Sequence, residues 1–138
     1  MKSAGRIASD GEKSRVLVRA SEFYTSDATV RPAFFNAAAT IASDGEHSRV
    51  LLAVLARTGL DKETFIEVIH SAERISSDGE KARVLRQVAA ICPNDDAIVT
   101  ALMRAVETIT SDGEYRRVMS AVLGRSDLSA RVRKIKYI

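Results

Sequence analysis

The residues of this sequence that could do chemistry are few, and most of them recur at one spacing. The word Ser-Asp-Gly-Glu begins at serines 34 residues apart: Ser9, Ser43, Ser77 and Ser111. Each copy brings two carboxylates that could ligate a metal, and each is followed by a guanidinium that could bind an anion. The aspartates are Asp10, Asp44, Asp78 and Asp112, and the arginines are Arg15, Arg49, Arg83 and Arg117.

Metal and cofactor chemistry is not supported by this spacing. Packed helices lie about 8–10 Å apart, so aspartates of adjacent repeats are too distant to share one ion. His47 and His70 fall in different expected helices, with no Cys or His partner at ligand spacing. No nucleophile–base–orienter set and no Gly-rich phosphate loop is visible. The sequence therefore predicts no metal, no cofactor and no enzymatic activity.

The recurring arginines have two interpretations. They could form a basic stripe that grips an acidic ligand. Alternatively, each could pair with the Glu three residues earlier, or with an acidic residue of an adjacent repeat, and so fix the stacking of repeats. Every Arg comes with its own Asp and Glu, which leaves the stripe close to neutral, and we therefore favour the structural interpretation.

The recurring glycines, Gly11, Gly45, Gly79 and Gly113, stand in the first turn of an expected helix. Gly in a helix interior costs about 1 kcal/mol relative to Ala, so four copies indicate a steric reason. An anion bound at the helix N-termini would be repelled by the flanking Asp and Glu. We therefore expect the close approach of a neighbouring hairpin.

The elements that position these residues follow from the repeat, which is the strongest signal in the chain. Ser-x-x-Glu is a capping box, in which the Ser side chain and the Glu side chain each accept a backbone N–H of the first turn. An apolar face follows it, for example Val50, Leu51, Val54 and Leu55. Breakers such as Pro93 then introduce a second amphipathic helix in each unit.

We therefore predict an all-α fold, an α/α superhelix (solenoid) of four 34-residue helical hairpins with about eight helices. The chain forms a single helical-repeat domain over residues 1–138, with units at approximately 7–40, 41–74, 75–108 and 109–138. A shared Ile stands two residues before each word, at Ile7, Ile41, Ile75 and Ile109. Because only one or two residues separate this Ile from the start of the next helix, we expect neighbouring hairpins to stack closely.

The stretch Ser-Asp-Gly-Glu-Lys-x-Arg-Val-Leu, at 9–17 and 77–85, carries a family resemblance. It resembles the HEAT-like Ser-Asp-aromatic-Glu-Lys…Val-Leu helical repeats in the C-terminal regions of bacterial regulator-type membrane metallopeptidases that sense β-lactams. The chain departs from that pattern at the aromatic position, where every unit has Gly, and it lacks His-Glu-x-x-His. The resemblance implies a helical-repeat fold and a sensing or docking role in a larger bacterial regulator.

Four aromatic residues gather in the first unit: Phe23, Tyr24, Phe34 and Phe35. They could fill the core at the end of the solenoid. They could equally form an apolar end face that another protein, further repeats or a second copy covers, since the terminal repeats of a free-standing solenoid should be polar outside. Self-association there would be symmetric and two-fold, giving a homodimer through the N-terminal repeat.

The last expected helix carries a candidate basic patch, Arg131, Arg133, Lys134 and Lys136, on a chain of net charge +3. Its apolar stripe is Leu128, Val132 and Ile135, so this helix should close the stack as a polar cap. The basic residues could touch nucleic acid or another acidic surface, although the excess charge is mild. Cys92, the single cysteine, is expected to be a small buried residue at a helix end.

The first residues lack the apolar core of a signal peptide, and no apolar run is long enough to span a bilayer. We expect a soluble chain, cytoplasmic as it stands and extracytoplasmic if it is part of a larger membrane protein. The expected function is protein binding by a non-enzymatic scaffold, through variable residues on one face of the array. The alternatives are nucleic-acid or acidic-surface binding through the basic last helix, and a structural spacer within a longer chain.

Overall fold

Stacked helical hairpins make up the part of the chain that the computed structural model describes, residues 9–24 and 29–136. Eight α-helices and no strand occur in those residues. The first helix of each unit is α2 (Asp10–Ser21), α4 (Asp44–Leu55), α6 (Asp78–Ile91) and α8 (Asp112–Leu123). The second is α3 (Val30–Ala38), α5 (Lys62–Glu73), α7 (Asp96–Val106) and α9 (Ser126–Lys136). The prediction of an all-α fold of about eight helices is confirmed.

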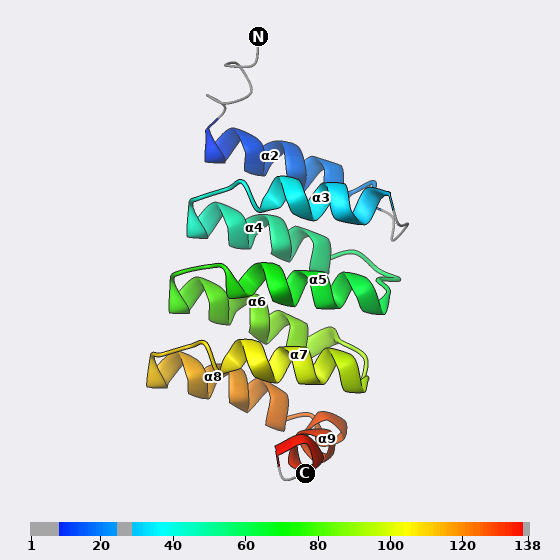
Figure 1. Ribbon diagram of the computed structural model, residues 1–138, viewed down its shortest axis with the longest axis vertical. Helices are drawn as coiled ribbons and strands as arrows, with labels where there is room; N and C mark the ends of the chain where they lie inside the picture. Colours follow the sequence, from blue (N-terminus) through cyan, green and yellow to red (C-terminus); the bar gives the residue numbers. More distant parts are fainter. Residues whose placement is uncertain (1–8, 25–28, 137–138) are drawn as a thin grey trace.

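The hairpins stack one after another along the long axis of the molecule (Figure 1). Each first helix packs on the next first helix, and each second helix packs on the next second helix, which produces two layers. The Ser-Asp-Gly-Glu words line one edge of the stack, and the loops inside the hairpins line the opposite edge (Figure 1). We call these the word edge and the loop edge.

The core lies between the two layers and is built from the predicted apolar faces. In the third unit, Val84, Leu85, Val88 and Ala89 have no exposed surface, and the shared Ile41, Ile75 and Ile109 are buried with them. Ile7 lies outside the described residues. Burial of these side chains is the main favourable term in folding, worth roughly 1.5–3 kcal/mol for each large aliphatic residue.

The helices begin and end where their caps predict. In every unit the Ser hydroxyl of the word accepts a hydrogen bond from the backbone N–H of the Glu three residues later. The N–O distances are 3.1, 3.3, 3.2 and 3.3 Å for Ser9, Ser43, Ser77 and Ser111. Asp61 and Asp95 cap α5 and α7 in the same manner. The hairpin loop after α4 reverses through Gly59, whose φ of 71° favours glycine. Pro93 follows the C-cap of α6, Cys92, which is buried as expected.

The last helix departs from the register of the others. In the first three units the connection between the two helices is at least four residues long, whereas only Gly124 and Arg125 connect α8 to α9. Figure 1 shows α9 almost end-on, although α3, α5 and α7 lie across the view. Leu128 and Val132 remain buried because α9 still packs on α7 and α8.

Candidate functional site

The recurring aspartates join each unit to the next. Asp10 Oδ2 accepts the N–H groups of Ala42 and Ser43 at 3.1 and 2.7 Å. Asp44 accepts those of Ser76 and Ser77 at 3.2 and 2.7 Å. These carboxylates therefore bind the backbone at the start of the following unit's first helix, and no metal is needed to explain their spacing.

The third copy of this contact gains a hydroxyl. Asp78 Oδ2 accepts the N–H groups of Thr110 and Ser111 at 3.1 and 2.8 Å and the Thr110 hydroxyl at 2.9 Å. The hydroxyl and the two backbone donors hold the pKa of Asp78 below its ordinary value. This role of the aspartates was not predicted from the sequence, although one signal was present: a carboxylate at the same helical position in every unit.

The aspartate contacts change the predicted capping box. The Glu side chain returns to the Ser backbone N–H only in the first unit, where Ser9 N donates to Glu12 Oε1 at 3.3 Å. In the later units that N–H is already bound by the preceding Asp. The prediction of a reciprocal box in all four units is therefore wrong for three of them, because a stronger acceptor reaches the donor from the adjacent unit.

One of the glutamates released from the box, Glu80, contacts the preceding unit instead. Glu80 Oε1 accepts the Ser48 hydroxyl at 2.6 Å. One unit earlier, the corresponding atoms, Ser14 Oγ and Glu46 Oε1, are both buried without a hydrogen-bond partner. The register places these two atoms opposite each other, as it does Ser48 and Glu80, and Arg49 Nε lies 3.6 Å from Glu46 Oε1.

Three of the four recurring arginines form ion pairs within their own helices. Arg49, Arg83 and Arg117 lie 3.6, 3.3 and 2.6 Å from the Glu three residues earlier. Their side chains are more than half exposed, and exposed pairs of this kind contribute about 0–1 kcal/mol. The intrahelical pairing was predicted, but Asp10, Asp44 and Asp78, rather than the arginines, connect the stacked units.

The expectation that the recurring glycines permit close helix approach is wrong. A Cβ atom at Gly45 or Gly113 would meet no atom within 4 Å, and at Gly11 or Gly79 it would meet side chains only at ordinary contact distances. The nearest atom of a following hairpin, Glu114 Oε2, would lie 3.9 Å from a Cβ at Gly79, which is an ordinary contact distance. Nothing in the packing of the described residues requires a glycine there.

Gly45→Ala is therefore expected to stabilise the protein by about 0.5–1 kcal/mol, because Ala loses less backbone entropy on folding and no contact opposes it. Chemical denaturation measures the change. Gly59→Ala is the matched control and should destabilise, since its positive φ strains an L-residue. A loss of stability at Gly45 would show that the position is more crowded than the structure indicates.

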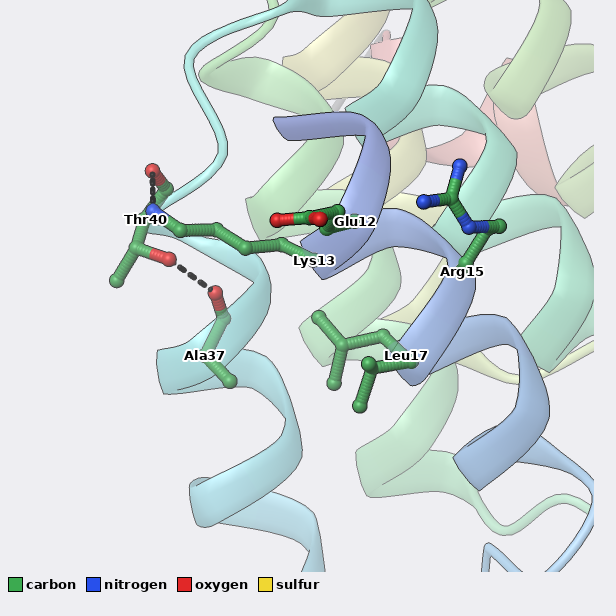
Figure 2. A pocket seen from close by; sticks show the side chains of 7 residues that line it. Glu12, Lys13, Arg15, Leu17, Ala37 and Thr40 are labelled. Carbon is green, nitrogen blue, oxygen red and sulfur yellow. Dashed lines mark hydrogen bonds between the residues drawn. The ribbon is translucent and has the colours of Figure 1, made fainter. Parts of the chain in front are cut away.

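The residue after each word's Glu joins the two layers. His47 Nε2 lies 2.7 Å from the Ser71 hydroxyl, and both residues are buried. Lys81, at the same position one unit later, donates to the Thr108 hydroxyl at 2.9 Å and is also buried. Lys13 reaches the Thr40 carbonyl at 3.4 Å, as Figure 2 shows. His47 and Ser71 thus form a layer contact and not an accessible nucleophile–base pair.

Burial, reinforced by the nearby Arg74, holds the pKa of His47 below its ordinary value, and Asp44 opposes this only weakly. The folded state therefore binds fewer protons than the unfolded state just below the ordinary pKa of about 6.5. We expect stability that is full above that pH and declines as pH falls through the lowered pKa. Chemical denaturation at several pH values between 7.5 and 5.5, roughly one unit either side of the ordinary histidine pKa, measures this decline in the free energy of unfolding. His47→Gln should flatten the decline, and an unchanged decline would contradict the assignment.

The aromatic residues of the first unit mostly belong to the core. Phe34 and Phe35 are 6% exposed, and Tyr24 meets both rings edge-to-face at centroid distances of 5.5 and 6.2 Å. The Tyr24 hydroxyl is 2.7 Å from that of Thr64. Phe23 alone of the four stands out, with 80% of its surface exposed. The predicted association face therefore cannot use Phe34 or Phe35.

The basic residues of α9 do not act as one patch. Arg131 binds the Asn94 side chain at 2.6 Å and Asp96 at 3.2 Å, so its charge is used within the fold. Arg133 and Lys134 are exposed, and the side chain of Lys136 lies outside the described residues. Arg125 donates to the Cys92 carbonyl at 2.7 Å, which caps the C-terminus of α6 from the next unit.

A groove opens on the loop edge between the second and third units. It measures about 550 Å³ and is lined by the loop after α4 and the end of α6, including Leu60, Phe65, Ile91 and Pro93. Ile91 is 40% exposed, and Arg57 and Gln87 contribute polar groups to the lining. Concave, mainly apolar surface with a few polar groups is typical of ligand-binding sites.

Comparisons of this chain with protein-family models, curated proteins and solved structures found no match. The arrangement of the side chains is therefore the basis for assigning a role. Within residues 9–24 and 29–136, no cluster of three or more His, Cys, Asp or Glu residues could hold a metal ion. No helix in the same residues is long and apolar enough to cross a bilayer.

Proposed function

We propose that this chain is a non-enzymatic helical-repeat scaffold that binds another protein at its loop edge. The observation that carries the proposal is a division between the two edges. The word edge keeps Ser-Asp-Gly-Glu in every unit, and these residues are used to cap helices and to join units. The loop edge keeps the capping aspartate of the second helix, as at Asp61 and Asp95, but its other side chains differ from unit to unit.

One position illustrates this division. This position lies where the first helix of each unit ends, and it recurs every 34 residues. Its residues in the four units are Phe23, Arg57, Ile91 and Arg125. Phe23, Arg57 and Ile91 are exposed. Repeat proteins recognise partners through such variable side chains on a constant framework.

The groove beside Ile91 indicates what kind of partner would fit. Leu60, Phe65 and Pro93 offer apolar contact, and Arg57 can meet a carboxylate at the rim. An extended peptide segment with one bulky apolar side chain and a nearby acidic residue satisfies both. We therefore expect a protein partner that presents such a segment, and the aliphatic contact should supply most of the affinity.

Selection from a phage-displayed random peptide library tests this proposal. We expect enrichment of peptides that carry an apolar residue next to Asp or Glu, and at least tenfold weaker binding of those peptides to Ile91→Asp, because a buried carboxylate would lack a partner. Ala90→Asp is the matched control, since Ala90 is also exposed at the end of α6 but does not line the groove. Absence of enrichment, or equal binding to Ile91→Asp, would refute the proposal.

The second candidate function is binding of nucleic acid or another acidic surface through α9. Only Arg133 and Lys134 are exposed basic side chains in the described part of that helix, which makes this the weaker proposal. Two phosphate contacts would give a plot of log affinity against log salt with a slope of roughly −1.4 to −1.8. Titration of an oligonucleotide at several salt concentrations measures that slope, and no binding at low salt would exclude this function.

The resemblance to repeats of regulator-type membrane metallopeptidases supports a narrower version of the first proposal, in which the chain is the sensing or docking part of a larger bacterial regulator. The alternative of a structural spacer predicts no partner at the groove. The full reading frame around this sequence separates these cases: a membrane metallopeptidase domain upstream would support the regulator.

Self-association through the first unit is also part of the proposal. With Phe34 and Phe35 in the core, the exposed apolar residues of that unit are Val16 and Phe23, at 66% and 80%. Val16 lines the groove between α2 and the end of α3, and Phe23 lines a second groove beside Tyr24 and Phe34, so this unit exposes apolar surface that a partner could cover.

A further inference from the structure

The contact between one first helix and the next uses corresponding positions at each internal junction. The earlier helix contributes an Asp at its N-terminus, a small residue four positions later and a buried residue near its C-terminus, which is Ser21, Leu55 or Ala89; we call this side the trailing face. The later helix contributes the Ser N–H, the word's Glu and two apolar residues of the next turns; we call this side the leading face. In the second unit the leading face consists of Ser43, Glu46, Val50 and Val54.

The leading face of the first unit has no neighbour among the described residues. Val16 is 66% exposed, whereas Val50, Val84 and Val118 at the same position have no exposed surface. Ala20 is exposed, whereas its counterparts Val54, Val88 and Val122 are fully buried. Between α2 and the end of α3 this face forms a groove of about 530 Å³, whose floor includes Leu17 and Ala37 (Figure 2).

The trailing face of the fourth unit is uncovered as well. Within the described residues the carboxylate of Asp112 is exposed and accepts no hydrogen bond, although Asp10, Asp44 and Asp78 each bind two backbone N–H groups. Leu123 is 48% exposed, while Leu55 and Ala89 at the same position are 2% and 0% exposed.

Charge distinguishes these two end faces from the internal ones. Ser14, Ser48 and Ala82 occupy one trailing-face position, and the fourth unit has Arg116 there. The register places this position opposite the Glu of the next word, as the contact between Ser48 and Glu80 at 2.6 Å shows. A second copy placed against this end would bring the Glu of its own first word, Glu12, opposite Arg116, and Glu12 is exposed.

We propose that a second copy of this chain stacks head-to-tail on the first, with α8 of one copy against α2 of the other. Asp112 then accepts the Ser9 N–H, Arg116 pairs with Glu12, and Leu123 covers Val16 and Ala20. The aspartate contact repeats one that every internal junction makes, and the Arg116–Glu12 pair takes the place of the Ser48–Glu80 contact. A two-fold pairing of two leading faces would cover Val16 but would leave Asp112 and Arg116 unused and bring two copies of Glu12 together.

The tilt of α9 limits the strength of this contact. Because α9 leaves the register of α3, α5 and α7 (Figure 1), the second layer cannot continue with the same geometry across the junction. The association therefore rests on the first helices and should be weaker than an internal junction and reversible. A heterologous interface of this kind gives open chains of copies that lengthen with concentration.

A pair of single-ended variants tests the proposal by analytical ultracentrifugation of the 138-residue chain. Val16→Glu disables the leading face and Leu123→Glu disables the trailing face; both residues are exposed, so both variants should fold, which circular dichroism verifies. We expect the wild type to form dimers and larger species as concentration rises toward about 1 mM. Each variant alone should be monomeric, and an equimolar mixture should form a dimer and nothing larger.

The mixture decides between the modes of association. A Leu123→Glu protein that still dimerises alone, together with a mixture that forms no additional dimer, would show two-fold pairing and overturn the head-to-tail proposal. A wild type that is monomeric throughout would overturn any self-association of these faces. Neither result touches the loop-edge groove, so peptide binding and stacking can fail independently.

Discussion

Phe34→Ala is expected to lower the free energy of unfolding by about 3–5 kcal/mol, the range for truncating a buried Phe. The ring is 6% exposed and packs edge-to-face against Tyr24 and Phe35 at centroid distances of 5.5 Å. Its removal would leave a cavity at the end of the stack, where only one neighbouring hairpin is present among the described residues to support the core. Urea denaturation followed by circular dichroism measures the change.

Phe23→Ala is the matched control, because it removes the same ring from the same unit. Phe23 is 80% exposed, so its loss should alter stability by no more than about 0.5 kcal/mol. Comparable losses for the two variants would mean that Phe23 packs in solution on a surface that the structure leaves open. An insensitive Phe34 would place the N-terminal core elsewhere.

Asp44→Ala is expected to lower the free energy of unfolding by about 2 kcal/mol, because two backbone N–H groups lose a charged acceptor. Asp44 binds Ser76 and Ser77 of the following unit at 3.2 and 2.7 Å. Two fully buried charge-assisted bonds would contribute more, about 1.5–3 kcal/mol each, but Asp44 is partly exposed to water. Because the contact joins two units, the denaturation transition should also broaden as coupling between units falls.

Asp112→Ala provides the reference for that measurement. Both aspartates stand in the first turn of a helix, so both variants lose the same dipole interaction of about 0.3–1 kcal/mol. Only Asp44 makes the cross-unit bonds, and the difference between the variants therefore reports their contribution. The two variants should be compared at low protein concentration, because stacking of copies through Asp112 would otherwise contribute to the measured stability. Equal losses at the two positions would contradict a role for these aspartates in joining units.

These aspartates explain why the word is so constant. Ser caps its own helix, Asp binds the start of the next helix, and Glu is thereby released to contact the preceding unit, as Glu80 does with Ser48 at 2.6 Å. The Ser and Asp roles recur at every internal junction, whereas among the described residues a Glu contact of this kind joins only Glu80 and Ser48. A substitution in one copy weakens one junction, because each repeat of a solenoid contacts only its neighbours.

The sequence by itself determined the repeat, the helical hairpins and most of the core. Local rules were sufficient, because capping serines and apolar periodicity act within one helix and the copies reinforce one another. Val84, Leu85 and Val88 were assigned to the core from spacing alone, and the structure buries all three. The Arg–Glu pairs were also predictable, since three-residue separation in a helix brings two side chains together.

Only the tertiary structure decided which neighbour each polar group meets. Whether Ser43 N binds its own Glu46 or the distant Asp10 depends on the offset between stacked helices, and spacing within one helix does not contain that offset. Phe23 and Phe34 are chemically identical in the sequence, yet one is exposed and the other buried, because the angle between α2 and α3 selects which ring faces the core. The tilt of α9 likewise depends on its short connection and on how its apolar stripe meets α7 and α8, and that packing is a property of three helices together.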